Sequence, residues 1–427
     1  MNSLESKFYK ALAPLLMISI ILSCAPIGLQ KSIKRINHYY VYQKFLQILW
    51  ALIVYISIVL GAYHEYFLWT GVLPIVQLPF YLSEIVLYLL HVLQIMILSY
   101  FGRNIFIYLL ESIVDFDDKL KQLKIHLHYN DLRKFLRNHL FLNFAFFLCA
   151  TTLGYIQRST TFLGFLSINS SYTLPNVIIQ TSLMQYYALT YVINKRMQLL
   201  YQLIDQVLKQ SPTKNVFNVQ KKLRFLRGLY SDIDEYTKHL NETFSISILL
   251  YFMSSYAIEW AETEFIWMAY AIVEICVQFA RVFLLLHYNQ GVQNQKKRAT
   301  VLFTSFRHIN ERLEPTIGRF ITQLSADPRN YIICGIIPLK MNVMMAMFVV
   351  VSTLFIFLVQ YDITYEALIN AGIKHEHRKV RCNFHPGSFQ KCVINLPFHP
   401  IQHFGCDNSS RLRERLFREA SQNAKIC

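Results

Sequence analysis

The sequence has 427 residues, of which 54% are hydrophobic and 16% are charged. Because a soluble domain carries about 25% charged residues, this composition excludes an ordinary soluble protein and predicts a polytopic membrane protein surrounded by lipid. The net charge of +16 would suggest a nucleic-acid partner in a soluble chain. In a membrane protein, Lys and Arg in the loops fix the orientation and explain the same charge, so no nucleic acid is expected.

The first 44 residues predict a cytoplasmic lead-in. Residues 11–29 are apolar enough to pass for a signal peptide, but Pro14 and Pro26 interrupt the run and a basic cluster follows at once. Cleavage there would place this cluster on the translocated side. We therefore expect 11–29 to be cytoplasmic and partly embedded in the membrane; if it spans instead, the number of spans rises to eight.

Apolar stretches of membrane-spanning length follow along the rest of the chain. They lie at about 45–69, 78–101, 139–157, 173–194, 244–260, 265–287 and 341–361. The last, MNVMMAMFVVVSTLFIFLVQY, would form a helix of about 31 Å, enough to cross a hydrocarbon core of ~30 Å. The fifth is short and the sixth carries Glu274, Gln278 and Arg281, so these two are the weakest. The sequence predicts an all-α fold with seven transmembrane helices.

The basic residues predict which ends face the cytoplasm. Thirty of the 42 Lys and Arg residues lie in four segments, 1–44, 102–138, 195–243 and 288–340. The loops on the other side hold one, Arg158. By the positive-inside rule the N-terminus is inside, and seven crossings place the C-terminus outside. Losing only one of the two weak spans would turn the basic segment 288–340 outward, so they are present or absent together.

The inner segments are long and patterned like helices, whereas the outer loops have roughly ten residues each. Residues 197–208, 219–236 and 301–324 place apolar side chains at i, i+3 and i+4. They predict cytoplasmic helical extensions that pack together. The alternative is amphipathic helices that lie on the inner leaflet.

Glycosylation motifs provide a check on this orientation. Asn169 begins Asn-Ser-Ser on the predicted outer side, and Asn408 begins the same motif near the C-terminus, so both could carry a glycan. Asn241 begins Asn-Glu-Thr on the predicted inner side and should not be modified.

Several function classes fit poorly. A G-protein-coupled receptor has its N-terminus outside, the reverse of the predicted orientation. An intramembrane hydrolase needs a nucleophile with a base, or a metal cluster, but His91 is the one clear mid-membrane histidine and neither HExxH nor GxSxG occurs. We therefore expect no catalytic residues, no metal and no cofactor. A transporter would show internal repeats and broken helices, which the sequence lacks, and it stays an alternative.

A short motif lies just before and within the last predicted span. Cys334 and Gly335 lead into the final span, and within it Thr353 precedes a hydrophobic run that ends at Gln360. This pattern resembles the C-terminal signature of insect gustatory receptors, in which Cys-Gly precedes the last helix and Thr-Tyr, five hydrophobic residues and Gln-Phe follow.

The sequence departs from this signature at Leu354 and Tyr361, where the family has Tyr and Phe. The resemblance covers roughly residues 1–361. It implies a gustatory chemoreceptor in the plasma membrane of sensory neurons, a non-selective cation channel opened by a small-molecule tastant. The channel would be a homo- or hetero-tetramer with related subunits, with 341–361 lining the pore. The implied pore and gate residues are Thr353, Gln360 and Tyr361. The alternative is a transporter or a non-conducting chemoreceptor subunit.

The resemblance also implies a ligand site within one subunit, in the outer halves of the second to sixth spans. Polar residues expected at that depth are Glu84, Gln180, Tyr256, Tyr270 and Glu274. Intramembrane carboxylates are costly and usually functional, although Glu274 could instead pair with Arg281. Segments 197–240 and 296–330 would form a cytoplasmic anchor joined by 331–340 to the pore helix, so that 45–340 holds the first six spans and the anchor.

Residues 362–427 do not fit the resemblance, because members of that family end shortly after the Gln-Phe pair. We expect an atypical extracellular tail with cysteines that could form disulfides. It is either an unstructured extension or a stretch translated past the usual last exon of that family. Its histidines and cysteines have poor spacing for zinc apart from His399 and His403.

Overall fold

The computed structural model describes residues 3–25, 37–69, 78–158 apart from 124, 126 and 128, 162–209, 216–254, 265–306, 313–325, 332–350 and scattered positions between 352 and 367. The chain divides into two compact units, Met1–Phe355 and Ile356–Cys427. The helix bundle belongs to the first unit.

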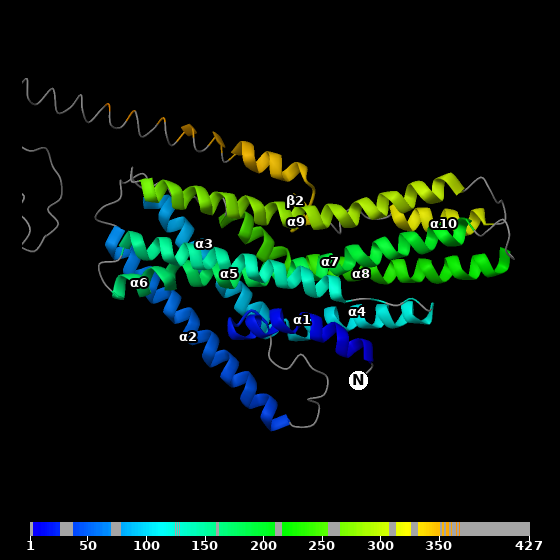
Figure 1. The fold of residues 1–427 in the computed structure, drawn as a ribbon, viewed down its shortest axis with the longest axis horizontal. Helices are drawn as coiled ribbons and strands as arrows, with labels where there is room; N and C mark the ends of the chain where they lie inside the picture. Colours follow the sequence, from blue (N-terminus) through cyan, green and yellow to red (C-terminus); the bar gives the residue numbers. More distant parts are fainter. Residues whose placement is uncertain are drawn as a thin grey trace, which may run out of the picture. The chain divides into compact units, whose positions relative to one another are not determined.

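The described chain is all-α, as predicted, apart from one short hairpin (Figure 1). Its elements in order are α1 (Ser3–Ile21), α2 (Asn37–Trp69), α3 (Leu78–Phe101), α4 (Arg103–Gln122), α5 (Asn130–Arg158), α6 (Phe162–Ile168), the π-helix η2 (Asn169–Thr173), α7 (Leu174–Lys209), α8 (Val216–Ser254), α9 (Phe265–Phe306), α10 (Glu314–Ser325), β1 (Ile332–Ile333) and β2 (Ile337–Pro338). The first six predicted spans fall, in order, on α2, α3, α5, α7, α8 and α9. Residues 342–350 of the seventh are helical.

Composition identifies fewer spans than the seven predicted. Among the described residues, two stretches are long and apolar enough to cross a membrane, Lys44–Phe67 in α2 and Leu82–Phe101 in α3. α7 does not qualify because its interior is polar; Gln180, Gln185 and Thr190 are all buried. Such side chains are tolerated at membrane depth where neighbouring helices, rather than lipid, surround them.

α7 lies at the centre of the bundle and packs against α1, α3, α5, α8 and α9. The Tyr186 hydroxyl lies 2.7 Å from Asn241 Oδ1 of α8 and 3.0 Å from Asn289 Oδ1 of α9. Its single proton is shared between two acceptors, so one side chain links three helices. Asn241 is 4% exposed, which leaves no room for a glycan at the motif predicted to be unmodified.

The long predicted inner segments are helices that lie side by side (Figure 1). They bury their apolar faces. The buried side chains recur at three- and four-residue spacing: Leu200, Ile204 and Leu208 on α7, Leu223, Leu226 and Tyr230 on α8, Phe303 on α9, and Phe320 and Leu324 on α10. The Phe303 and Phe320 rings lie 4.4 Å apart. The structure therefore has the packed arrangement rather than solitary amphipathic helices.

A buried ion pair ties α4 to α7 in this inner half. Asp117 is fully buried; Arg196 donates to it twice, from Nε at 2.6 Å and from Nη2 at 2.8 Å. Tyr129 donates a third hydrogen bond to Asp117 at 2.6 Å. Burial and then the Asp117 carboxylate raise the pKa of Tyr129, so this hydroxyl remains a donor. All three partners satisfy one another, as a buried charge requires.

The predicted lead-in forms α1, which packs against α4, α5 and α7. Its inward side chains are Phe8, Ala11, Leu12 and Leu15, all buried. Trp50 of α2 donates its indole N–H to the carbonyl oxygen of Ile21 at the end of this helix, at 2.7 Å. Whether α1 enters the membrane stays a prediction.

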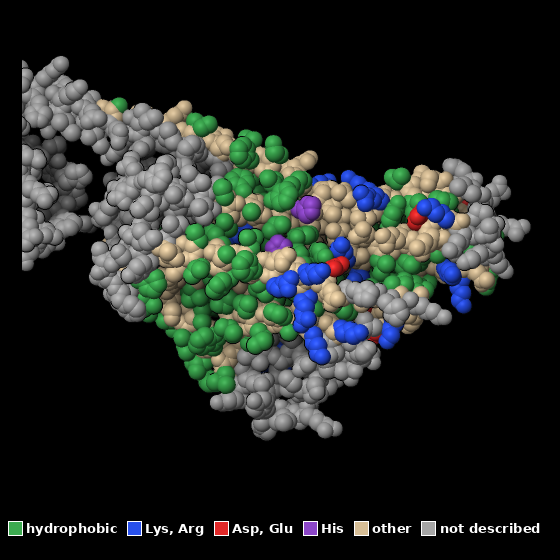
Figure 2. Space-filling model, in the orientation of Figure 1, with side chains coloured by type: hydrophobic (Ala, Val, Ile, Leu, Met, Phe, Trp, Pro, Cys, Tyr) green, Lys and Arg blue, Asp and Glu red, His purple; other side chains and the backbone are tan. Residues whose placement is uncertain are grey.

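The surface separates by chemistry along the bundle. On the face in Figure 2, apolar side chains gather over one half and Lys and Arg over the other. α5 carries the boundary: Arg137 is exposed, and Phe141, Phe144 and Leu148, 60–73% exposed, follow it. The predicted span begins at residue 139, so the apolar half matches the expected position of lipid.

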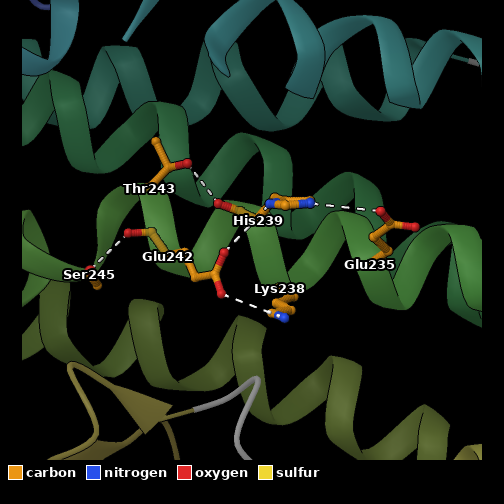
Figure 3. A network of polar contacts seen from close by, with 6 residues as sticks. All are labelled: Glu235, Lys238, His239, Glu242, Thr243 and Ser245. Atoms are coloured by element: carbon orange, nitrogen blue, oxygen red, sulfur yellow. Dashed lines mark hydrogen bonds and ion pairs between the residues drawn. The ribbon is translucent and has the colours of Figure 1, made fainter. Parts of the chain in front are cut away.

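α8 shows a similar boundary (Figure 3). His239 lies 3.5 Å from Glu242 and 3.8 Å from Glu235, while Lys238 lies 3.9 Å from Glu242. These exposed pairs contribute little stability individually. They end just before Ile246, which is 54% exposed, so the polar network stops where the predicted span 244–260 begins.

The second outer loop is more structured than its length suggested. Residues 162–173 form α6 and η2, which pack against α2. Ser167 Oγ lies 3.0 Å from both His64 Nδ1 and Glu65 Oε1. Glu65 is fully buried. Such close approach is possible because Gly61 of α2 has no side chain.

Gly61→Ala is expected to destabilise this outer packing. A Cβ at Gly61 would clash with the Ser170 side chain and lie 3.0 Å from the Ser167 carbonyl oxygen. Overpacking of this kind costs about 1–3 kcal/mol. Thermal unfolding of the purified protein checks it, with Gly228→Ala as the control, since that helical glycine has nothing within 4 Å. Equal or higher stability of Gly61→Ala would contradict the contact.

Candidate functional site

Two of the five predicted ligand residues can be placed with their side chains. Glu84 on α3 and Gln180 on α7 are buried, 6% and 5% exposed, on helices that pack together. Tyr256 lies outside the described residues, and so do the side chains of Tyr270 and Glu274, although α9 includes both positions. That the five residues form one pocket stays a prediction.

A layer of buried polar contacts lies in the same bundle. These contacts between helices were not predicted from the sequence. We call it the polar layer; its members are His91 on α3, Tyr187 on α7, Ser247 and Tyr251 on α8, and Gln278 and Arg281 on α9. His91 Nε2 lies 2.9 Å from Ser247 Oγ, and Tyr251 donates to Gln278 Oε1 at 2.8 Å. These contacts join α8 to the helices on either side of it.

Heptad spacing was the signal that could have found the polar layer. His91 follows Glu84 by seven residues on α3, and Tyr187 follows Gln180 by seven on α7. Seven residues make nearly two helical turns, so each pair lies on one face. Glu84 and Gln180 therefore lie on the same faces of α3 and α7 as His91 and Tyr187, about two helical turns away.

Several buried polar atoms here have no hydrogen-bond partner among the described residues. They are His91 Nδ1, Gln180 Oε1, and Nε and Nη2 of Arg281. A buried polar group without a partner costs about 1–3 kcal/mol, and more when charged. Water or a bound ligand can supply the missing hydrogen-bond partner of such groups.

The Cys-Gly pair is the turn of a β-hairpin. Cys334 and Gly335 have φ of 50° and 71°, and Ile336 N donates to Ile333 O at 2.9 Å. Positive φ at both central residues is the geometry of a type I′ turn. Gln293 of α9 donates to the carbonyl oxygen of Leu339 at 2.9 Å, which fixes the hairpin's exit toward the last helix. From the sequence, residues 331–340 were expected only to connect α10 to the last helix.

Gly335→Ala is expected to destabilise this hairpin by about 1 kcal/mol, because left-handed backbone is unfavourable for an L side chain. The same substitution at Gly318, inside α10 with open space around it, should stabilise by about 0.5–1 kcal/mol. Thermal unfolding of both variants measures the pair. Opposite signs are the expected result, and stabilisation by both substitutions would contradict the turn geometry.

The predicted pore residues lie at the edge of what the structure describes. Thr353 is exposed and donates its hydroxyl to the carbonyl oxygen of Val349 at 2.8 Å. Gln360 is helical and exposed, and its carbonyl oxygen accepts from Thr364 at 2.7 Å. Tyr361 lies outside the described residues. Their role in a pore stays a prediction.

Glycosylation at the two predicted sites also stays a prediction. Asn169 is half-buried in η2, and its side-chain amide donates to the carbonyl oxygen of Phe165 at 2.8 Å. A glycan on this nitrogen would require that bond to be rearranged. Asn408 lies outside the described residues.

Comparison with known proteins agrees with the fold and the motif. Residues 79–365 match the family model described as 7tm Chemosensory receptor. Gustatory receptor 59f of Drosophila melanogaster is 29% identical over 387 residues, 85% of this chain and 89% of that protein. The insect olfactory receptor OR5 from Machilis hrabei, solved alone and in complex with eugenol, superposes with a TM-score of 0.63 at 15% identity, covering 83% of this chain and 99% of that one. The chain therefore belongs to the 7tm chemosensory receptor family, multi-pass membrane proteins that are receptors and not enzymes.

Proposed function

We propose that the chain is a gustatory receptor subunit that forms a non-selective cation channel opened by a small-molecule tastant. It would act in the plasma membrane of sensory neurons, with its N-terminus inside. Family membership and the similarity to a gustatory receptor support the sensory role. The observation that carries the channel role is the exposure of the last helix.

Among its described residues, that helix packs one side against its own chain. In the first compact unit, Met347 is 4% exposed, whereas Met345, Phe348 and Val349 are 55–66% exposed. An exposed apolar patch of this kind marks a surface made for lipid or for a partner. A helix with one anchored side can line a central conduit when four subunits assemble, which supports a homo- or hetero-tetramer with related receptors.

In this proposal Gln360 forms the constriction. Four uncharged amides in a ring replace part of a cation's hydration shell without binding it tightly, and neighbouring apolar or aromatic side chains gate by dewetting. Tyr361 would supply that collar, and Thr353 precedes Gln360 by seven residues, the length of about two helical turns.

Ligand would enter the bundle from the outer side, among Glu84, Gln180, Tyr256, Tyr270 and Glu274. Eugenol, the ligand in the related olfactory receptor complex, is a small organic molecule, which supports the same class of ligand here. The free carbonyl oxygen of Gln180 can accept a hydrogen bond from a ligand hydroxyl. The inner helices would serve as the cytoplasmic anchor, and residues 362–427 as an extracellular tail.

Expression in oocytes with two-electrode voltage clamp tests the proposal. Sugars, plant alkaloids, organic acids and amino acids are applied singly, with the chain expressed alone and with related receptor subunits. We expect at least one compound to evoke an inward current that reverses near 0 mV and is carried by both Na⁺ and K⁺. Surface-expressed protein that moves substrate without current would favour a transporter, and surface protein silent in every combination would favour a non-conducting subunit.

A further inference from the structure

Arg281 is a buried cation, and two of its guanidinium nitrogen atoms have no hydrogen-bond acceptor among the described residues. The side chain lies on α9, is 3% exposed, and has neighbours on α7 and α5. No acceptor among the described residues reaches its Nε or Nη2. The guanidinium carbon lies 5.2 Å from the centre of the Phe146 ring of α5. Tyr187 of α7 donates to the main-chain oxygen of Arg281, at 3.0 Å, and so holds the backbone without neutralising the charge.

The same chain shows what this edge binds when a partner is present. Arg196 donates from Nε and from Nη2 to the two carboxylate oxygens of Asp117, at 2.6 and 2.8 Å. Nε and Nη2 form one side of the planar guanidinium and match a carboxylate at two points. Arg281 presents the same two atoms, similarly buried, and no carboxylate of a described residue lies opposite them.

Burying a guanidinium without an acceptor for these N–H groups costs free energy. A cation at membrane depth is unfavourable unless it is paired or hydrated, and functional sites are where such residues persist. The Phe146 ring face supplies only a partial counter-charge. A planar anion with two oxygens would satisfy both free N–H groups at once, whereas a neutral hydroxyl could satisfy only one and would leave the charge.

We propose that Arg281 binds the carboxylate of a small-molecule ligand through Nε and Nη2. The proposal rests on the channel function above and narrows its ligand to organic acids. The carboxylate lies between α5, α7 and α9, and the remainder of the ligand extends toward the outer half of the bundle, past Gln278 and Gln180. Occupation ties α5 to α9, so ligand binding is coupled to the arrangement of the helices.

Two other anions could compete for this edge. Glu274 lies seven residues earlier on α9, about 10.5 Å along the helix axis. An anionic lipid headgroup offers oxygens of similar chemistry, but the 3% exposure of Arg281 keeps it away from bulk lipid. The small-molecule carboxylate is the proposed partner, and the experiment distinguishes it from Glu274 and from a lipid headgroup.

The test uses the full chain in phosphatidylcholine nanodiscs, with acetate as the probe and chloride at matched ionic strength as the reference. Thermal unfolding is followed for the native protein, Arg281→Gln, Arg281→Lys and the exposed-site control Arg137→Gln. We expect acetate to raise the Tm of the native protein and Arg137→Gln by a few degrees when it exceeds its Kd about a hundredfold. Arg281→Gln should show no such rise, and Arg281→Lys a smaller one, because an ammonium lacks the planar fork.

The absolute stabilities provide a second readout. Without acetate, Arg281→Gln should unfold at the same temperature as the native protein or higher, because it removes an unpaired buried charge. A lower Tm for both Arg281→Gln and Glu274→Gln, with no acetate response in the native protein, would overturn the proposal in favour of an internal ion pair. An acetate response that disappears in phosphatidylserine nanodiscs, where the native protein alone gains stability, would overturn it in favour of lipid.

This measurement does not depend on conduction. An Arg281-dependent acetate response without any organic-acid current in oocytes would retain the carboxylate site and refute the channel. Tastant-evoked current that is unchanged in Arg281→Gln, together with equal acetate responses in both proteins, would retain the channel and refute the site.

Discussion

Gln360→Arg is expected to lower the tastant-evoked cation current at least tenfold at negative voltage. In a tetramer this substitution places four positive charges around the proposed constriction. A barrier of about 1.4 kcal/mol already reduces a rate tenfold, and like charges at close range in a narrow pore exceed that amount. Voltage clamp with saturating tastant, normalised to surface protein, measures the effect. Gln360→Ala should keep conduction but change the ratio of Na⁺ to K⁺ permeability.

Gln206→Arg is the matched control, because Gln206 is an exposed amide on the inner extension of α7. The same charge added there should leave the current and its selectivity unchanged. A Gln360→Arg channel with native current at equal surface level would show that this residue does not face the conduction path.

Asp117→Ala is expected to destabilise the bundle by about 3–5 kcal/mol, since it leaves Arg196 buried without its carboxylate. It also removes the acceptor of the Tyr129 hydroxyl. The loss should be visible as a lower Tm in detergent and as reduced surface expression. Asp232→Ala breaks the exposed Lys119–Asp232 pair between α4 and α8 and should cost only about 0–1 kcal/mol.

Removing both charges of the Asp117–Arg196 pair tests whether the cost of Asp117→Ala comes from the charge left unpaired. Asp117→Leu combined with Arg196→Met replaces the ion pair by apolar side chains and should recover much of the stability lost in Asp117→Ala, because no buried charge is then left alone. A double variant as unstable as the sum of its single changes would mean that the two residues act independently, which contradicts the two-point geometry.

Much of the bundle could be predicted because its physical signals are local. Apolar length predicted helices where α2, α3, α5, α7, α8 and α9 lie. The helical period in 197–208 and 219–236 predicted the inner ends of α7 and α8, where the same positions are buried. Each signal depends only on residues a few turns apart, so no knowledge of the tertiary arrangement was needed.

Features that depend on close approach between distant segments were missed. The packing of η2 on α2 requires the absence of a side chain at Gly61, more than a hundred residues from Ser170. The hairpin was missed because Cys334 adopts positive φ, which sequence rules assign to Asn or Asp before Gly. In each case the tertiary contact selects a conformation that local preference leaves open.

The candidate site was predictable to within a helical turn and no further. Glu84 and Gln180 were expected inside the bundle and are buried there. Arg281 was expected only as a partner for Glu274, because a sequence cannot show which edge of a guanidinium is satisfied. The free edge became visible only when the neighbours of α9 were in place.

The account depends on the basic segments facing the cytoplasm, so that the last helix runs outward through the membrane. An epitope tag fused at residue 1 measures this most directly, by antibody labelling of cells before and after permeabilisation. We predict labelling only after permeabilisation, while a tag inserted after residue 367 is labelled on intact cells. Labelling of the residue-1 tag on intact cells would contradict the orientation and, with it, the proposed pore.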